Sequence, residues 1–93
     1  MSFSLHIAHS AKKSLDKLSD KTTAKILLHL EELQSDPFKP RPGVDIVKIQ
    51  GRKAPPAYRL RLGNLRIEYV VFEREKLIRI IRIFRRSGDS DYR

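Results

Sequence analysis

The chain has 93 residues, no cysteine, a formal net charge of +9 and a pI near 10.3. This length suits a single domain, expected over residues 1–93, and the lack of cysteine excludes a disulfide framework and a thiolate metal site. No apolar run approaches the roughly 18 residues of a membrane span, and the N-terminus lacks a signal-peptide pattern, so we expect a cytoplasmic protein without membrane contact. The charge favours an anionic partner, with nucleic acid ahead of an acidic protein.

The N-terminal half is predicted to form one strand and two helices. Residues 2–7 alternate between apolar and polar side chains, which predicts a short strand with an apolar side of Phe3, Leu5 and Ile7. Ser10 is predicted to cap a first helix that begins at Ala11. A second helix, over about residues 21–35, is predicted to bury Ile26, Leu27, Leu30 and Leu33. The two helices should form an antiparallel hairpin that covers an apolar surface.

The C-terminal half is predicted to form a sheet. The proline-rich residues 38–43 form an extended linker, and strands are predicted over residues 44–49, 58–62, 65–72 and 77–84. The fold class is therefore α+β, with the N-terminal strand and the helical hairpin packed on one face of a small antiparallel sheet. The opposite face should be open and basic.

Gly63-Asn64 defines a tight hairpin turn and with it the register of the two strands around it. Leu62 should face Leu65, Arg61 should face Arg66, and Arg59 should face Glu68. Because side chains alternate across a strand, one face of the hairpin is then apolar and must be buried. That face consists of Tyr58, Leu60, Leu62, Leu65, Ile67 and Tyr69.

The other face of the hairpin carries arginines, and Arg61 directly opposes Arg66. Like charges that face each other across two strands are destabilising, so a bound polyanion is the simplest reason for the arrangement. The alternative is a solvated face with Arg59 and Glu68 as an ordinary cross-strand pair. Arg79 should join this face, with Arg85 and Arg86 near it where the last strand ends. Arg82 would point into the core unless a bulge releases it.

Other kinds of catalytic site find little support in the residues. The histidines His6, His9 and His29 lack metal-ligand spacing, and the serines lack a nucleophile context. A cluster of guanidiniums, by contrast, can hold a phosphodiester and stabilise the charge of a five-coordinate transition state. RNA supplies its own nucleophile, the 2′-hydroxyl. Tyr92 can stack on a base or donate a proton there, or it is simply a terminal residue without a role.

The chain resembles the RelE family of the RelE/ParE toxin superfamily over nearly its whole length. The resemblance rests on the element order, on Lys48-Ile49-Gln50-Gly51, on Arg85-Arg86 and Tyr92, and above all on the stretch from Tyr58 to Tyr69. It implies a toxin of a type II toxin–antitoxin system that enters the ribosomal A site and cleaves mRNA. The cleavage would need no metal or cofactor and would proceed by 2′-hydroxyl attack to a cyclic phosphate. The partners implied are the ribosome, mRNA and an acidic RelB-like antitoxin.

Residue by residue, the resemblance assigns catalytic roles to Arg59, Arg61, Arg66, Arg86 and Tyr92. The further positions expected to bind RNA are Lys48, Arg52, Lys53, Arg79 and Arg85. Close relatives carry lysines where this chain has Arg59 and Arg61, and an arginine stays charged, so these two are assigned to phosphate orientation and charge stabilisation. The general base stays unassigned. A ParE-like gyrase inhibitor and a non-catalytic RNA-binding protein are the alternatives.

Overall fold

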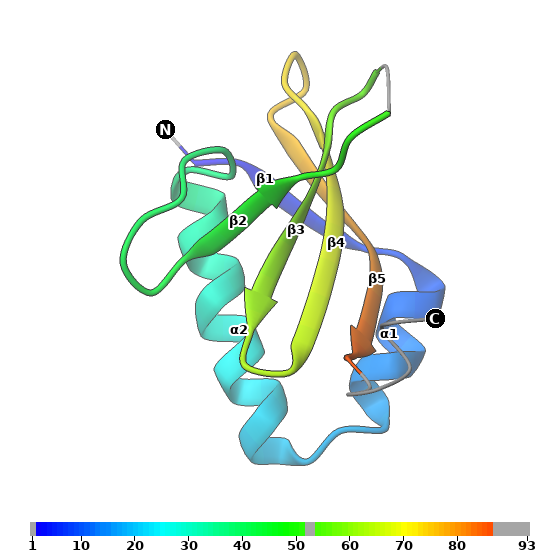
Figure 1. Cartoon of the computed structure of the whole chain (residues 1–93). Coiled ribbons are helices and arrows are strands. Elements are labelled where there is room, and N and C mark those ends of the chain that lie inside the picture. Colours follow the sequence, from blue (N-terminus) through cyan, green and yellow to red (C-terminus); the bar gives the residue numbers. More distant parts are fainter. Residues whose placement is uncertain (1, 52–53, 87–93) are drawn as a thin grey trace.

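The computed structural model describes residues 2–51 and 54–86. Its elements are strand β1 (Ser4–Ile7), helices α1 (His9–Asp16) and α2 (Asp20–Ser35), and strands β2 (Asp45–Lys48), β3 (Ala57–Leu62), β4 (Leu65–Phe72) and β5 (Leu77–Arg85). The strands form one sheet in the order β1-β5-β4-β3-β2. Both helices lie on the same side of this sheet (Figure 1). The predicted α+β class is confirmed, but the N-terminal strand lies within the sheet as an edge strand and is not packed on its face with the helices.

The sheet is mixed, which corrects the prediction of an antiparallel sheet. Strands β2 to β5 form an antiparallel meander, but β1 pairs in parallel with β5 and places Leu5 beside Ile78. The meander leaves the outer edge of β5 free for the N-terminal strand. The alternation of a four-residue strand carries no information about direction, so this pairing is decided by how the helices carry the chain across the sheet.

The two helices begin differently from each other. Helix α2 begins at Asp20, one residue before the predicted start, and the Ser19 hydroxyl accepts a hydrogen bond from the Thr22 backbone N–H at 3.1 Å. Helix α1 begins at His9, earlier than predicted, and Ala8 at its N-cap position makes no side-chain hydrogen bond. The predicted cap by Ser10 is wrong. Its hydroxyl instead donates to the carbonyl of Ile81 at 3.2 Å and ties α1 to β5.

The core lies between the helices and the sheet. Helix α2 contributes Ile26, Leu30 and Leu33, all buried as predicted, whereas Leu27 is 44% exposed, so its predicted burial is wrong. Leu27 follows Ile26 by about 100° around the helix, and the sheet covers only the stripe spaced i, i+4, i+7. The sheet contributes the buried side chains Ile46, Leu60, Leu65, Ile67, Tyr69, Val71, Ile78, Ile80 and Ile83.

The segment after α2 is held against the sheet by Tyr69. Its buried hydroxyl donates to the carbonyl of Pro37 at 2.7 Å, and its ring stacks on Tyr58 with the ring centroids 5.7 Å apart. Burial raises the pKa of Tyr69 far above its ordinary value. The Asp36 carboxylate accepts hydrogen bonds from the backbone N–H groups of Phe38 and Lys39. The bond from Phe38 is the main cause that lowers the pKa of Asp36.

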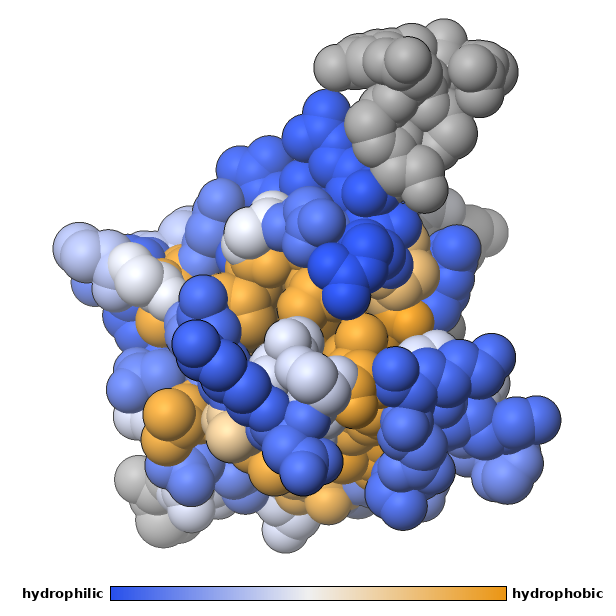
Figure 2. All heavy atoms as spheres, turned by 90° about the horizontal axis from the view of Figure 1, so that it is seen from below, coloured by the Kyte–Doolittle hydropathy of each residue, from blue (hydrophilic) through white to orange (hydrophobic). Residues whose placement is uncertain are grey.

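The end of the molecule that carries the β3–β4 turn shows hydrophobic atoms between hydrophilic ones (Figure 2). A hollow of about 300 Å³ at this end is lined by Ser14, Lys17, Leu18, Leu65, Ile83, Phe84 and Arg85. Neither helix within residues 2–51 and 54–86 has the length and hydrophobicity of a membrane span.

Candidate nucleic-acid interface

The hairpin of β3 and β4 has the register that the turn predicted. Leu62 pairs with Leu65, Arg61 with Arg66 and Arg59 with Glu68. Gly63 has φ of 59°, a conformation that glycine adopts without steric cost. The turn therefore places every second side chain of both strands on the face away from the helices.

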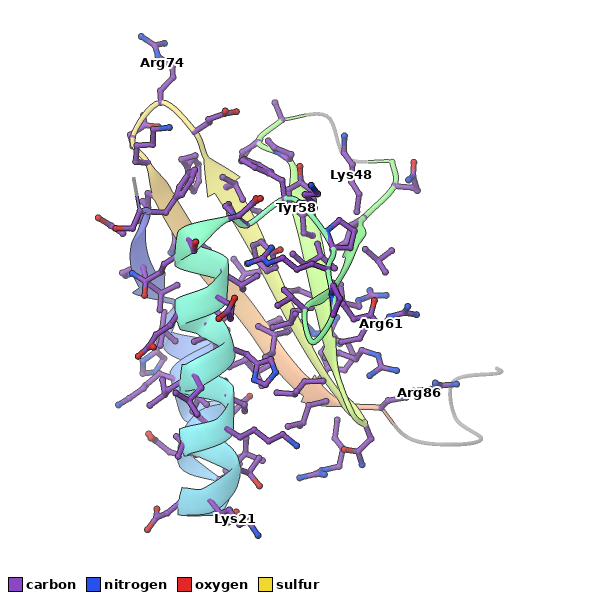
Figure 3. The ribbon with its side chains drawn as sticks, turned by 90° about the vertical axis from the view of Figure 1, so that its left-hand side faces the viewer. Lys21, Lys48, Tyr58, Arg61, Arg74 and Arg86 are labelled. Carbon is purple, nitrogen blue, oxygen red and sulfur yellow. The ribbon has the colours of Figure 1, made fainter. Side chains whose placement is uncertain are left out.

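A shallow groove of about 560 Å³ lies on that face. Five arginines and one aromatic side chain line it: Arg59, Arg61, Arg66, Arg82, Phe84 and Arg86. Arg61 and Arg86 point away from α2 on the far side of the sheet (Figure 3). Strands β3 and β4 and the residue after β5 thus bring together four arginines that the sequence singled out. We call this surface the arginine groove.

Arg59 and Arg61 in the groove each form two hydrogen bonds to a carboxylate. The Glu68 Oε2 atom accepts from Arg59 Nε at 3.0 Å and from Arg59 Nη2 at 2.6 Å, and Glu68 is only 7% exposed. Arg61 forms two bonds to Asp45 on β2, at 3.0 and 3.1 Å. The Arg59–Glu68 pair, which the alternative of a solvated face expected, therefore exists. Its two hydrogen bonds hold the guanidinium of Arg59, which lines the groove.

Arg66 and Arg86 are attached to the hairpin turn. Arg66 Nη1 donates to the carbonyls of Gly63 and Leu65 at 2.8 and 2.9 Å, and the backbone N–H of Arg86 donates to the carbonyl of Asn64 at 2.6 Å. The hydrogen bonds of Arg66 go to carbonyls, and no carboxylate within residues 2–51 and 54–86 forms an ion pair with it. The turn thus positions two cations at one end of the groove.

A β-bulge determines on which face of the sheet Arg82 lies. The register between β4 and β5 shifts between Glu68 and Tyr69, so Tyr69 pairs with Ile80 and Glu68 pairs with Arg82. Beyond the shift, Arg82 and Phe84 point to the groove side. The sequence raised a bulge as the way to release Arg82, and the structure contains one. Arg82 and Phe84 were not among the predicted site residues, although the charge of Arg82 within an apolar alternation was the available signal.

The groove offers a surface for phosphates. Asp45 and Glu68 contact three of the five guanidiniums, so the described residues of this face carry more positive than negative charge. Guanidiniums bind phosphate oxygens in a planar, two-point geometry. Among residues 2–51 and 54–86, no group of three His, Cys, Asp or Glu side chains is placed to hold a metal ion.

Comparison with known proteins gives the family. The family model described as the ParE toxin of the type II toxin–antitoxin system parDE matches residues 5–90 of this chain. A protein of Methanocaldococcus jannaschii, named as a candidate RelE1 toxin, is 32% identical over 88 residues, which are 95% of this chain and 94% of that protein. The chain belongs to the RelE family of type II toxins.

Solved structures of RelE toxins share the fold. The archaeal RelE from the RelE–RelB complex of Pyrococcus horikoshii superimposes with a TM-score of 0.81 at 29% identity, covering 94% of this chain and 98% of that one. The isolated RelE toxin of E. coli gives a TM-score of 0.77 at 20% identity, covering 99% of this chain and 92% of that one. At the latter identity the likeness concerns the fold alone.

The positions expected of a RelE toxin are only partly brought together. Arg59, Arg61, Arg66 and Arg86 all line the arginine groove. Tyr92, with Arg52 and Lys53, lies outside the described residues, so the proposed contacts of these three with RNA stay predictions.

Three further basic residues lie away from the groove. Arg79 is on the uncovered face as expected, but it pairs with Val70, on the far side of the bulge from Arg82. Lys48 pairs with Tyr58 and so belongs to the helix side of the sheet. Arg85, expected beside the groove, pairs with Leu65 and lines the apolar hollow near α1 instead. Their predicted roles in RNA binding are untested, and this placement gives them no share in the groove.

Proposed function

We propose that this RelE-family toxin cleaves mRNA in the A site of the ribosome and so inhibits translation in the cytoplasm. The observation that carries the proposal is the arginine groove, which gathers four of the five residues assigned to catalysis on one uncovered face. Nucleic acid would reach that face without any displacement of α1 or α2, because both helices lie on the other side of the sheet (Figure 3).

The proposed reaction is a metal-independent transesterification. The 2′-oxygen of one nucleotide attacks the adjacent phosphorus, the bond from phosphorus to the 5′-oxygen breaks, and the products are a 2′,3′-cyclic phosphate and a 5′-hydroxyl. Arg59 and Arg61 would orient the phosphate, and Arg66 and Arg86 would stabilise the charge that develops on it. Tyr92 is proposed to deliver the proton to the leaving oxygen. The group that accepts the 2′-proton is left open, since positioning alone supplies a large part of such rate enhancements.

We further propose that an acidic antitoxin binds this toxin. Support comes from the relative of Pyrococcus horikoshii, whose structure is a complex of RelE with RelB, and from the net charge of +9. A protein partner rich in carboxylates would neutralise much of this charge. A short acidic protein encoded beside this toxin is the expected partner, and its addition should abolish the toxic activity.

The decisive test compares Arg66→Ala with Arg74→Ala on ribosomes programmed with a defined mRNA. Arg66 lines the groove, whereas Arg74 is exposed in the β4–β5 turn at the far end of the molecule (Figure 3). Both variants lose one positive charge. Cleavage should fall by a factor of about 100 in the first variant, because one donor to the transition state is lost, and should be unchanged in the second. Equal cleavage by wild type and Arg66→Ala would contradict the proposal.

A second candidate is inhibition of DNA gyrase, because the matching family model is that of the ParE toxin. A gyrase inhibitor would block supercoiling by purified gyrase and would leave mRNA on ribosomes intact. The proposed nuclease should do the opposite in the same two assays. Binding to programmed ribosomes without strand scission would instead identify a non-catalytic member.

A further inference from the structure

Phe84 gives the arginine groove a surface that phosphate binding does not require. It is the one aromatic side chain in the described lining of the groove, and it is half-buried on β5, directly opposite Arg66. The guanidinium carbon of Arg82 lies over its ring at 4.1 Å from the centroid. An arginine over an aromatic ring forms a cation–π contact and covers the ring with a second flat group.

The Arg82 side chain is held in this position from a second direction. Its Nη1 atom lies 3.5 Å from Oε1 of Glu68, while the other carboxylate oxygen of Glu68 binds Arg59. Glu68 is nearly buried, whereas the Arg82 side chain is 61% exposed. The carboxylate and the ring thus fix an arginine that still presents much of its surface to the solvent.

Unpaired bases of RNA stack on aromatic rings and on arginine planes. Since Arg82 and Phe84 share one groove with Arg59, Arg61 and Arg66, a nucleotide whose phosphate contacts these arginines would bring its base to the pair. We propose that Arg82 and Phe84 form a stacking platform for one nucleobase of the bound RNA, with Glu68 as a positioning residue. This inference rests on the proposed function, because it names how the same groove binds the base.

Binding of a single-stranded RNA with one 2-aminopurine, moved through the sequence, tests the platform directly. Stacking quenches 2-aminopurine fluorescence, so wild type should quench it strongly at one position. In Phe84→Leu the quenching should be lost and affinity should fall roughly tenfold. Phe72→Leu is the matched control, because Phe72 is also half-buried on the uncovered face but does not line the groove. It should bind and quench like wild type.

Removal of one nucleobase from the RNA gives a second test, because a purely structural role of Phe84 would not make binding depend on that base. An abasic site at the quenched position should weaken binding to wild type roughly tenfold and should leave binding to Phe84→Leu unchanged. Urea unfolding of each variant shows whether the fold is retained. Equal affinity of wild type for intact and abasic RNA would overturn the proposal. So would equal losses in Phe84→Leu and Phe72→Leu.

The charge-conserving change Arg82→Lys separates the platform from electrostatics. It removes the flat guanidinium but keeps the positive charge, so quenching should decrease while the salt dependence of binding stays the same. Arg74→Lys, in the β4–β5 turn and outside the groove, is its control and should change neither. A response of both variants alike would count against the platform.

These binding measurements need neither ribosomes nor cleavage. The nuclease proposal can therefore fail, with mRNA left intact on ribosomes, while base-dependent binding persists. Conversely, cleavage that survives in Phe84→Leu with unchanged binding would remove the platform and leave the nuclease in place.

Discussion

The two faces of the sheet differ in what their side chains do, and strand β3 shows this within consecutive residues. Leu60 is fully buried against the helices, while Arg61 on the opposite face is 47% exposed and bonded to Asp45. The covered face stabilises the fold by burying apolar area. The uncovered face gathers like charges, which costs stability and provides a surface for an anion. Alternation along one strand therefore separates folding from binding, and substitutions of neighbouring residues should affect different properties.

The largest expected effect on stability comes from Leu60→Ala. Truncation of a fully buried leucine should lower the free energy of unfolding by about 2–5 kcal/mol, because apolar contacts are lost and a cavity remains. Arg61→Ala, the adjacent residue on the other face, should cost less than about 1 kcal/mol, as exposed ion pairs do. Urea unfolding at neutral pH measures both. Comparable losses would show that the groove is part of the structural core.

Tyr69→Phe is expected to lower stability by about 1–2 kcal/mol, since the buried carbonyl of Pro37 loses its hydrogen-bond donor. It should also change the response to alkali. Burial raises the pKa of Tyr69 in the folded state, so its contribution is complete below about pH 10, the unfolded pKa, and is lost as the pH rises above it. Urea unfolding at pH 8 and pH 11 should show a smaller decline in the variant. A decline as steep as that of wild type would contradict this.

The two neighbouring residues Leu60 and Arg61 should also differ in their effect on RNA binding, which Arg61→Ala is expected to weaken. The loss of one phosphate contact should reduce the slope of log K against log salt by about one unit and weaken RNA binding roughly tenfold at low salt. Leu60→Ala, studied where it is still folded, should keep the wild-type slope. Titration of a single-stranded RNA at several salt concentrations provides the measurement. An unaltered slope in Arg61→Ala would mean that this arginine contacts no phosphate.

The smallest effect is expected at Asp36, far from the groove. Hydrogen bonds from the Phe38 and Lys39 backbone lower its pKa in the folded state. The carboxylate therefore contributes stability above its usual pKa of about 4, and this contribution is lost as the pH falls through the lowered value. The side chain is only partly buried, so the change should stay below about 1 kcal/mol. In Asp36→Asn the acid-induced loss of stability between pH 6 and pH 3 should be smaller than in wild type. Parallel curves would assign that loss to other groups.

Local sequence patterns predicted much of the fold and four members of the groove. The turn at Gly63-Asn64 fixed which residues of β3 and β4 oppose each other, and from this register Arg59, Arg61 and Arg66 followed. Strand β4 was predicted with its observed bounds, Leu65–Phe72. The prediction that Leu27 is buried was wrong, because helical spacing alone does not say how wide a stripe of the helix the sheet covers.

What the sequence by itself determined is the hairpin, because its turn, its alternation and its charges are local features that agree with one another. Tertiary structure alone decided two other matters. The pairing of β1 with β5 joins residues far apart in the chain, so no local pattern sets its direction. The register shift between Glu68 and Tyr69 turns Arg82 and Phe84 toward the groove and Arg85 away from it. One extra residue in a strand moves every later side chain of that strand to the opposite face of the sheet. Only the packing of the whole sheet determines where that residue is accommodated.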